Sequence, residues 1–222
     1  MSNKIAVMKI QIITLFPDMF SAVFGTSMLW KASDRGIVEY SIINLRDYGL
    51  GPRRQVDDTP YGGGDGMLLM AEPIISAIEH AKIVDPTAKV LLPTPRGRIY
   101  RQSDAKLLAQ AGQDGQGVIL ICPRYEGYDE RIVQWVDQQY CIGNYVLTGG
   151  ELPAMVVVDS IVRLLPGVLG GEMSTEIESF QSDDVSIEFP QYTRPLEYRG
   201  HKVPDVLLSG HHAEIAAWRQ IQ

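Results

Sequence analysis

Residues Cys141–Pro153, CIGNYVLTGGELP, decide the fold, because this stretch places open main chain between apolar segments. Glycine breaks occur at Gly143 and at Gly149–Gly150, and Glu151–Pro153 follow where a helix is expected to begin. Adjacent glycines adopt positive φ and let another group approach the main chain closely. Such a crossing either turns tightly or cradles a ligand, and both interpretations stay open for this stretch taken alone.

The composition indicates a globular protein with a full core. The chain has 222 residues, of which 45% are hydrophobic and 21% charged, enough for one domain or for one large and one small domain. The net charge of −7 provides no global attraction for nucleic acid, so RNA binding would need local basic patches. Cys122 and Cys141 stand beside apolar runs without neighbours at metal-ligand spacing, which predicts buried free thiols in a reducing cytoplasm. No apolar run approaches membrane-spanning length, so no membrane partner is expected.

Strands and helices alternate along the first three quarters of the chain. Short apolar or alternating runs predict strands over residues 9–15, 38–42, 89–92, 117–122 and 140–142. Helices are expected to start at Pro17, Pro73, Ser103 and Asp129, and a last one spans 154–165. This alternation predicts an α/β fold with a mostly parallel sheet.

Three loops follow predicted strands, namely 93–97, 123–127 and 143–153. Ligands gather at the carboxyl ends of strands in parallel sheets, so we expect these loops to converge on one edge. The helix 154–165 is apolar nearly all round and should be buried. Its polar side chains Asp159 and Arg163 are four residues apart, and this strip must meet a partner or line a pocket.

The composition changes after Gly171. We predict a first domain over 1–171, an acidic linker over 172–188 and a small second domain over 189–222. The linker contains six acidic residues and no Lys or Arg, which is typical of a mobile segment. The last segment is mildly basic and ends inside a helix opened by Ser209–Gly210, so the second domain is expected to be small or cut short.

Seven motifs occur in order along almost the whole chain, from Ile12 to about Arg219. They are IITLFPDMF from Ile12, VDDTPYGGGDGM from Val56, RYEGYDER from Arg124, IGNYVLTGGELPA from Ile142, DSIVRLLPGVLG from Asp159, PQYTRP from Pro190 and LSGHH from Leu208. Together they resemble the bacterial tRNA (guanine-N1)-methyltransferases, the TrmD family of the SPOUT class.

The resemblance implies transfer of a methyl group from S-adenosylmethionine to N1 of the guanosine at tRNA position 37. It also implies a trefoil knot in the α/β domain, a small helical C-terminal domain, a homodimer and a requirement for a divalent cation, usually Mg²⁺. Knots are very rare, so periodicity alone could not predict one. No cluster in the sequence is typical of a dedicated magnesium site, and the metal ligands stay unassigned.

By the same resemblance, three loops bind S-adenosylmethionine. The corresponding residues here are Leu92, Pro93, Thr94, Pro95 and Gly97, then Arg124, Tyr125, Glu126 and Gly127, then Ile142, Gly143, Tyr145, Leu147, Gly149, Gly150 and Pro153. Glycines suit this task, because they let backbone N–H and C=O groups reach the edges of an adenine. Pro123 departs from the glycine expected in the family motif and removes one backbone donor.

Methylation at N1 of guanine needs a general base, since N1 carries a proton. Negative charge then develops toward O6 and favours a nearby cation. The resemblance places the base at Glu178, where the family has an aspartate, and the cation at Arg163. The competing interpretations are that Glu178 is one solvated carboxylate of the linker and that Arg163 only pairs with Asp159.

The substrate residues implied by the resemblance fall into two groups. Asp58, Tyr61 and Gly63 belong to a long polar loop, 46–66, which is either functional or a mobile surface loop. Tyr192, Arg194, His211 and His212 belong to the tRNA-binding second domain, where either histidine could instead be an ordinary helix-start residue. Arg199 and Lys202 add local positive charge there.

Three other functions compete with N1 methylation. A SPOUT enzyme acting on a ribose or on rRNA fits the PYGGGDGM and GGELPA motifs poorly. A catalytically silent RNA-binding relative would keep the fold as a platform, and Glu178 is the best support for it. Arg163, Glu126 and both glycine-rich loops argue against the silent relative. A phosphate-loop nucleotidase does not fit, because the sequence has no G-x-x-x-x-G-K-[ST] motif.

Overall fold

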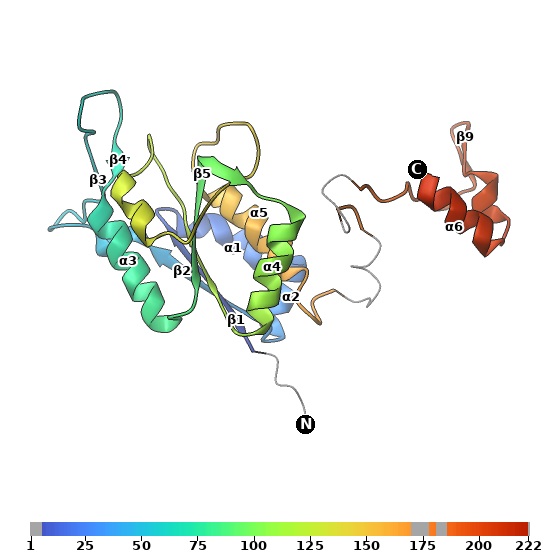
Figure 1. The fold of residues 1–222 in the computed structure, drawn as a ribbon, viewed down its shortest axis with the longest axis horizontal. Helices are drawn as coiled ribbons and strands as arrows, with labels where there is room; N and C mark the ends of the chain where they lie inside the picture. Colours follow the sequence, from blue (N-terminus) through green and yellow to red (C-terminus); the bar gives the residue numbers. More distant parts are fainter. Residues whose placement is uncertain (1–5, 170–177, 181–185, 222) are drawn as a thin grey trace. The chain divides into compact units, whose positions relative to one another are not determined.

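A computed structural model describes residues 6–169, 178–180 and 186–221 (Figure 1). The chain divides into two compact units, 1–170 and 171–222. Most residues of the predicted acidic linker, 172–188, lie outside the described residues, so its mobility stays a prediction.

The first unit is built on a five-stranded sheet with the order β2-β1-β6-β5-β7, and every neighbouring pair is parallel. The strands are β1 Met8–Thr14, β2 Val38–Asn44, β5 Lys89–Ile99, β6 Val118–Ile121 and β7 Gln138–Cys141. The predicted α/β fold with a mostly parallel sheet is therefore confirmed. Because all five strands run the same way, their carboxyl ends meet at one edge. The trefoil knot stays a prediction.

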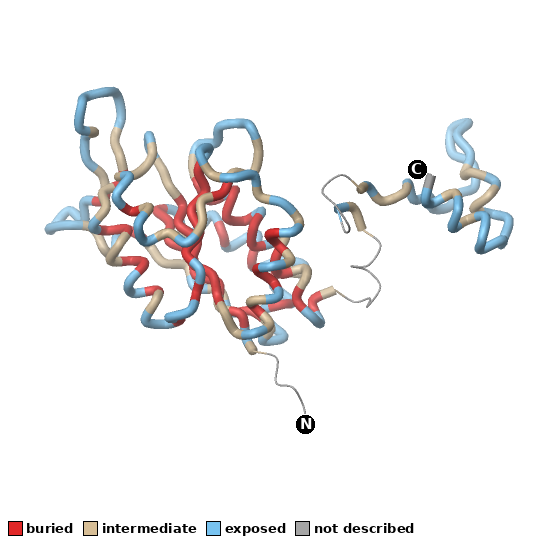
Figure 2. The backbone as a smooth tube through the Cα atoms, viewed as in Figure 1, coloured by how far each residue is buried: buried red, intermediate tan, exposed pale blue. Residues whose placement is uncertain are grey.

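Helices cover both faces of this sheet, with α3 on one side and α4 and α5 on the other (Figure 1). The first face carries α3 Ala71–Val84 and the 3-10 helix η3 Glu130–Trp135. The second carries α1 Ser21–Phe24, α2 Ser27–Asp34, α4 Gln102–Gln113 and α5 Glu151–Val162. Burial is concentrated in the strands and in the helix sides that face them (Figure 2). Each face thus has its own apolar cluster, separated by the sheet.

Helix α5 is the buried helix that the sequence predicted. Val157, Val158, Ile161 and Val162 are all fully buried. The helix begins at Glu151 rather than at the expected Ala154. The earlier start is allowed because Pro153 falls in the first turn, where a backbone N–H has no helical partner to lose.

Two of the predicted helices differ from the structure in detail. The helix expected from Pro17 is divided into η1 Pro17–Phe20, α1 and α2. Thr26 separates α1 from α2 because its backbone is extended and its hydroxyl donates to the Ala22 carbonyl, 2.8 Å away. Helix α4 is capped by Arg101 rather than by Ser103, since the Asp104 carboxylate accepts from the Arg101 N–H at 2.9 Å.

Strand β5 runs past the expected end at Leu92. Its pairing with β7 shifts register between Pro93 and Arg98, both of which oppose Tyr140. The intervening residues therefore bulge from the ladder. A Cβ on Gly97 would lie 2.4 Å from the Tyr140 backbone nitrogen, so only glycine allows this approach.

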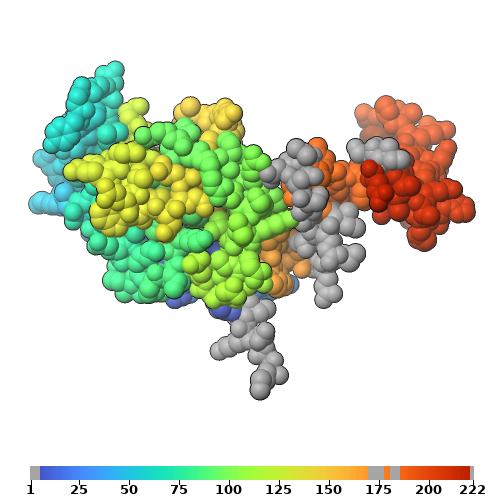
Figure 3. Space-filling view, in the orientation of Figure 1, coloured from blue at the N-terminus to red at the C-terminus, as the bar shows by residue number. Residues whose placement is uncertain are grey.

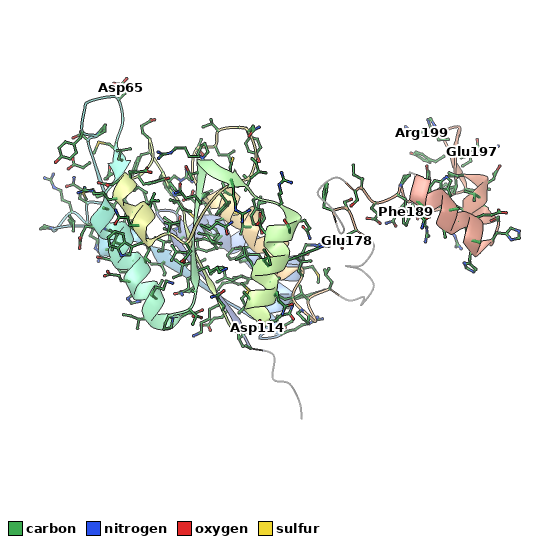
Figure 4. All side chains as sticks on the ribbon, viewed as in Figure 1. Asp65, Asp114, Glu178, Phe189, Glu197 and Arg199 are labelled. Atoms are coloured by element: carbon green, nitrogen blue, oxygen red, sulfur yellow. The ribbon has the colours of Figure 1, made fainter. Side chains whose placement is uncertain are left out.

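The long loop predicted over 46–66 contains the short 3-10 helix η2 Leu45–Tyr48 and leads into a hairpin of β3 Asp57–Asp58 and β4 Leu68–Leu69. The chain between β3 and β4 projects from the body of the first unit (Figures 1 and 3). Asp65 lies at the far end of this projection (Figure 4).

The second unit is small. It consists of the hairpin β8 Glu197–Tyr198 and β9 His201–Lys202, the 3-10 helix η4 Asp205–Leu208 and the helix α6 His212–Ile221. None of its described residues is buried. Its contacts are between aromatic and cationic side chains, with Tyr192 and Trp218 ring centroids 6.4 Å apart and the Arg219 guanidinium 4.5 Å from the Phe189 ring.

Candidate functional site

A cavity of about 500 Å³ opens at the carboxyl edge of the sheet, where the loops after β5, β6 and β7 meet. Its wall includes every residue that the sequence assigned to cofactor binding except Leu92 and Gly97. The three loops therefore converge as expected. The volume lies within the range of about 300–1,000 Å³ that is usual for small-molecule sites.

The two exceptions support the wall from behind. Leu92 is fully buried in the apolar cluster against α3. Gly97 lies against the main chain of Tyr140, and Tyr140 is itself part of the cavity wall. Neither residue lines the cavity.

Gly149 and Gly150 are glycines for steric reasons. A Cβ on Gly149 would lie 2.3 Å from Arg124 Nε, and one on Gly150 would lie 2.6 Å from Pro123 Cδ and 2.7 Å from Cys122 Cα. The Gly150 N–H donates to the Pro123 carbonyl at 2.9 Å. The β7 loop thus lies directly on the β6 loop, and Pro123 still supplies an acceptor although it lacks an N–H.

The β6 loop also contacts the β3–β4 hairpin. Its backbone is left-handed at Tyr125, with φ of 59°, and the Glu126 N–H donates to the Met67 carbonyl at 3.0 Å. A Cβ on Gly66 would lie 2.5 Å from the Glu126 side chain. The glycine-rich segment is thereby attached to the cavity wall.

Two of the three predicted substrate residues in this hairpin line a second hollow. Asp58 and Tyr61 line a space of about 520 Å³ together with Arg131 and Trp135. The Tyr61 side chain is fully exposed. Gly63 has a φ of 78° and nothing within 4 Å of an added Cβ, so it lies in open space.

A buried charged cluster lies beside the main cavity and was missed by the sequence reasoning. Glu151 is fully buried, and its Oε1 accepts from the Thr14 hydroxyl at 2.8 Å. Its Oε2 lies 2.8 Å from Arg124 Nε as an ion pair that lacks the geometry of a hydrogen bond. The sequence signal was a carboxylate that follows the glycine pair 149–150 and begins a helix that is apolar nearly all round. Its partners are far away in the chain, and periodicity does not reveal them.

The Cys122 thiol and the Tyr100 hydroxyl are not set up as reactive groups. Burial, followed by the negative charge of Glu151, raises the pKa of the Cys122 thiol well above its ordinary value. Burial also raises the pKa of the Tyr100 hydroxyl to about 12, although this hydroxyl lies 2.8 Å from Ser160 Oγ. Cys122 and Cys141 are both free, as expected, but only Cys122 is buried and the expected burial of Cys141 was wrong.

The two residues assigned to catalysis fall in different units. Arg163 is half-buried at the end of α5, where its N–H donates to the Asp159 carbonyl at 3.2 Å. Glu178 (Figure 4) is half-buried and precedes Ser179, whose hydroxyl accepts from the Glu188 N–H at 3.0 Å. Their catalytic roles stay predictions.

The substrate residues predicted in the second unit lie on its surface. Tyr192 is about half exposed, while Arg194, His211 and His212 are exposed. His211 precedes α6 and donates its N–H to Ser209 Oγ at 3.1 Å, and His212 is the first residue of that helix. Both histidines are thus helix-start residues, and their role in RNA binding stays a prediction.

Within residues 6–169, 178–180 and 186–221, no group of three or more His, Cys, Asp or Glu side chains could hold a metal ion. The ligands of the expected Mg²⁺ therefore stay unassigned. In the described part of the chain, no helix is long and apolar enough to span a bilayer.

The parallel sheet with a glycine-rich cavity at its carboxyl edge defines an α/β protein of the kind that binds a small molecule at this edge. The family model described as tRNA (Guanine-1)-methyltransferase TrmD matches residues 8–222. The chain belongs to this family.

Close relatives and a solved structure agree with the family. The tRNA (guanine-N(1)-)-methyltransferases of Citrifermentans bemidjiense and Geobacillus kaustophilus are each 50% identical over 214 residues, which is 96% of this chain and 84% and 85% of theirs. The crystal structure of the tRNA (m1G37) methyltransferase from Aquifex aeolicus has a TM-score of 0.79 and 36% identity, and the match covers 97% of this chain and 89% of that one.

Proposed function

We propose that this chain transfers a methyl group from S-adenosylmethionine to N1 of guanosine 37 in tRNA. The observation that carries the proposal is the convergence of the three loops on one cavity at the carboxyl edge of the sheet. Family membership over residues 8–222 supports the choice of reaction.

The cavity suits a nucleoside cofactor with a charged tail. Its wall combines apolar side chains such as Ile142 and Leu147 with the open main chain of Gly143, Gly149 and Gly150. Apolar contacts hold the flat base, and backbone N–H and C=O groups bind its polar edges. When bound, S-adenosylmethionine supplies an electrophilic methyl group on its sulfonium.

The residues proposed for the chemistry are Glu178 and Arg163. The Glu178 carboxylate would remove the N1 proton of guanine. The N1 electron pair would then bond to the methyl carbon as the carbon–sulfur bond breaks, and S-adenosylhomocysteine would leave. The Arg163 guanidinium stabilises the negative charge that develops on O6. Asp58, Tyr61 and Gly63 hold the target nucleotide. Tyr192, Arg194, His211 and His212 contact the surrounding tRNA.

The target base lies in a loop of the tRNA, which lowers the cost of bringing it into a closed pocket. Two free cysteines fit a reducing cytoplasm, where the tRNA substrate is found.

We also propose that two copies of the chain pair through a face of the first unit. Leu152 and Val156 are four residues apart on α5 and about half exposed. Phe16, Met19 and Val23 are exposed on the segments leading into and through α1. Helix α5 packs against η1, so the two sets of side chains lie on neighbouring elements. Exposed apolar side chains grouped in this way are typical of a protein interface.

The proposal is tested by single-turnover methylation with radiolabelled S-adenosylmethionine. Two unmodified tRNA transcripts are compared, one with guanosine and one with adenosine at position 37. We expect label only in the guanosine transcript, and Glu178→Gln should lose most of the rate while still binding the cofactor. Cofactor binding without transfer to either transcript would favour the silent RNA-binding relative. Transfer by Glu178→Gln at nearly the wild-type rate would place the base elsewhere.

A further inference from the structure

Glu151 is a fully buried carboxylate that the proposed chemistry does not use. It lies at the first position of α5, immediately after Gly150. The Thr14 hydroxyl donates to its Oε1 at 2.8 Å, and the same hydroxyl accepts from the Phe16 N–H at 2.9 Å. Glu151 therefore links the start of α5 to the carboxyl end of β1.

The other carboxylate oxygen fixes a residue of the cavity wall. Glu151 Oε2 lies 2.8 Å from Arg124 Nε, and the Arg124 side chain is 17% exposed. Arg124 also donates to the Thr148 carbonyl at 3.3 Å, and its guanidinium lies 4.5 Å from the centre of the Phe16 ring. Arg124 and Thr148 both line the cavity, one from the β6 loop and one from the β7 loop.

A buried ion pair is a poor way to stabilise a fold. Replacing such a pair with apolar side chains of similar volume is often neutral or stabilising, because both charges must leave water. The use of charged groups at this place is explained if they orient a neighbouring part of the chain that an apolar pair could not orient. Here a Cβ on residue 149 would lie 2.3 Å from Arg124 Nε, so the Arg124 side chain lies directly against the main chain of the β7 loop.

We propose that Glu151 is a positioning residue that holds Arg124 in place and, through it, keeps the β6 and β7 loops in the arrangement that binds S-adenosylmethionine. Thr14 fixes the orientation of the Glu151 carboxylate. This inference rests on the proposed function, because it concerns the affinity of the same cavity for the same cofactor.

The test is calorimetric titration of S-adenosylmethionine into the full chain and its variants. Glu151→Gln and Arg124→Met should each raise the dissociation constant by about tenfold or more, the size expected for loss of a charged contact. The double variant should bind no more than about twofold more weakly than the weaker single variant, because both changes break the same link. In turnover, Glu151→Gln should raise the KM for S-adenosylmethionine and leave kcat within about twofold.

Asp47→Asn is the matched control. It breaks an ion pair of the same length, 2.8 Å to Arg54, in which both side chains are more than half exposed. We expect it to bind within about twofold of wild type, since exposed pairs contribute little. Thr14→Val and Thr14→Ser are milder changes, because both keep the ion pair between Glu151 and Arg124. Thr14→Val should weaken the binding of S-adenosylmethionine. Thr14→Ser keeps the hydroxyl and should bind it as the wild type does.

The outcomes separate this inference from the proposed function. Suppose that the wild-type chain binds S-adenosylmethionine, and that folded Glu151→Gln or Thr14→Val binds it with a dissociation constant within about twofold of wild type. This result would overturn the positioning role alone. Effects of Glu151→Gln and Arg124→Met that multiply in the double variant would also overturn it. A wild-type chain that binds no S-adenosylmethionine would overturn the proposed function and this inference with it.

Discussion

Gly150 shows how a single residue determines the shape of the cavity. Its φ of −84° is accessible to any residue, so its requirement for glycine is steric rather than conformational. A Cβ there would lie within 2.7 Å of the Cys122 main chain, which cannot move aside as a flexible side chain would. Gly150→Ala should therefore destabilise the chain by about 1–3 kcal/mol, the usual cost of overpacking, and weaken cofactor binding.

Urea unfolding measures this cost, with Gly36→Ala as the comparison. Gly36 has a φ of 67° but nothing within 4 Å of an added Cβ. Its substitution should cost about 1–2 kcal/mol through backbone strain alone and leave cofactor affinity unchanged. Equal cofactor affinity in the two variants would show that the contact between Gly150 and Cys122 does not shape the site.

Asp85 gives a prediction for the pH dependence of stability. Burial raises the pKa of its carboxyl, but hydrogen bonds from the Thr87 hydroxyl and N–H and the Gly117 N–H outweigh burial, and the net pKa is lowered. A lowered native pKa stabilises the fold at pH values above the unfolded pKa of about 3.9, and this contribution is lost as the pH falls through the native value.

Asp85→Asn should therefore lower the free energy of unfolding by about 1–3 kcal/mol at pH 7, since it replaces the charged acceptor. The difference from wild type should shrink as the pH falls below about 4, because the carboxyl of the unfolded chain takes up a proton there, whereas the native carboxyl does so only at a lower pH. Chemical unfolding at pH 7 and pH 3 measures both values. A difference that stays constant between them would contradict the role given to the ionised carboxylate.

Among the helices, α4 offers a matched test of the two-sided core. Leu108 is 5% exposed and packs in the cluster that contains α5, whereas its neighbour Leu107 is 70% exposed. Leu108→Ala should cost about 2–5 kcal/mol and Leu107→Ala less than about 0.5 kcal/mol, because only the first leaves a cavity. Equal losses in thermal or urea unfolding would mean that α4 is packed differently.

Local sequence patterns predicted the helices and strands better than the points at which they end or break. Alternating residues such as Val38, Tyr40 and Ile42 identified β2, and the continuous apolar surface of α5 identified its burial. The extension of β5 beyond Pro93 escaped prediction, because a proline suggests the end of a strand unless its partner strand is known. The break at Thr26 depends on one side-chain hydrogen bond that periodicity does not record.

The candidate site followed a similar rule. The residues proposed to bind the cofactor were predicted from the resemblance of the motifs, and all but Leu92 and Gly97 line the cavity. The buried link from Thr14 to Glu151 was not predictable, since 137 residues separate the two and neither is unusual in its local setting. Long-range polar contacts are a property of the folded chain.

For the complete chain, the proposed homodimer predicts a twofold assembly in solution. Light scattering after gel filtration should give a mass twice that of the 24.7 kDa chain. Val156→Asp places a charge in the apolar face of α5 and should give a monomer, because an unpaired buried charge is strongly unfavourable. Ile83→Asp, at a residue 80% exposed on α3, is the control and should leave the dimer intact. A dimer that survives Val156→Asp would place the interface elsewhere.

The most direct measurement is the identity and position of the methylated nucleoside. An unmodified tRNA transcript with guanosine at position 37 would be incubated with the chain and S-adenosylmethionine, digested, and analysed by mass spectrometry against synthetic standards. We predict 1-methylguanosine at position 37 and no other new methylated nucleoside. A methyl group on a ribose, on another atom of guanine or at another position would contradict N1 methylation, whatever the affinity for the cofactor.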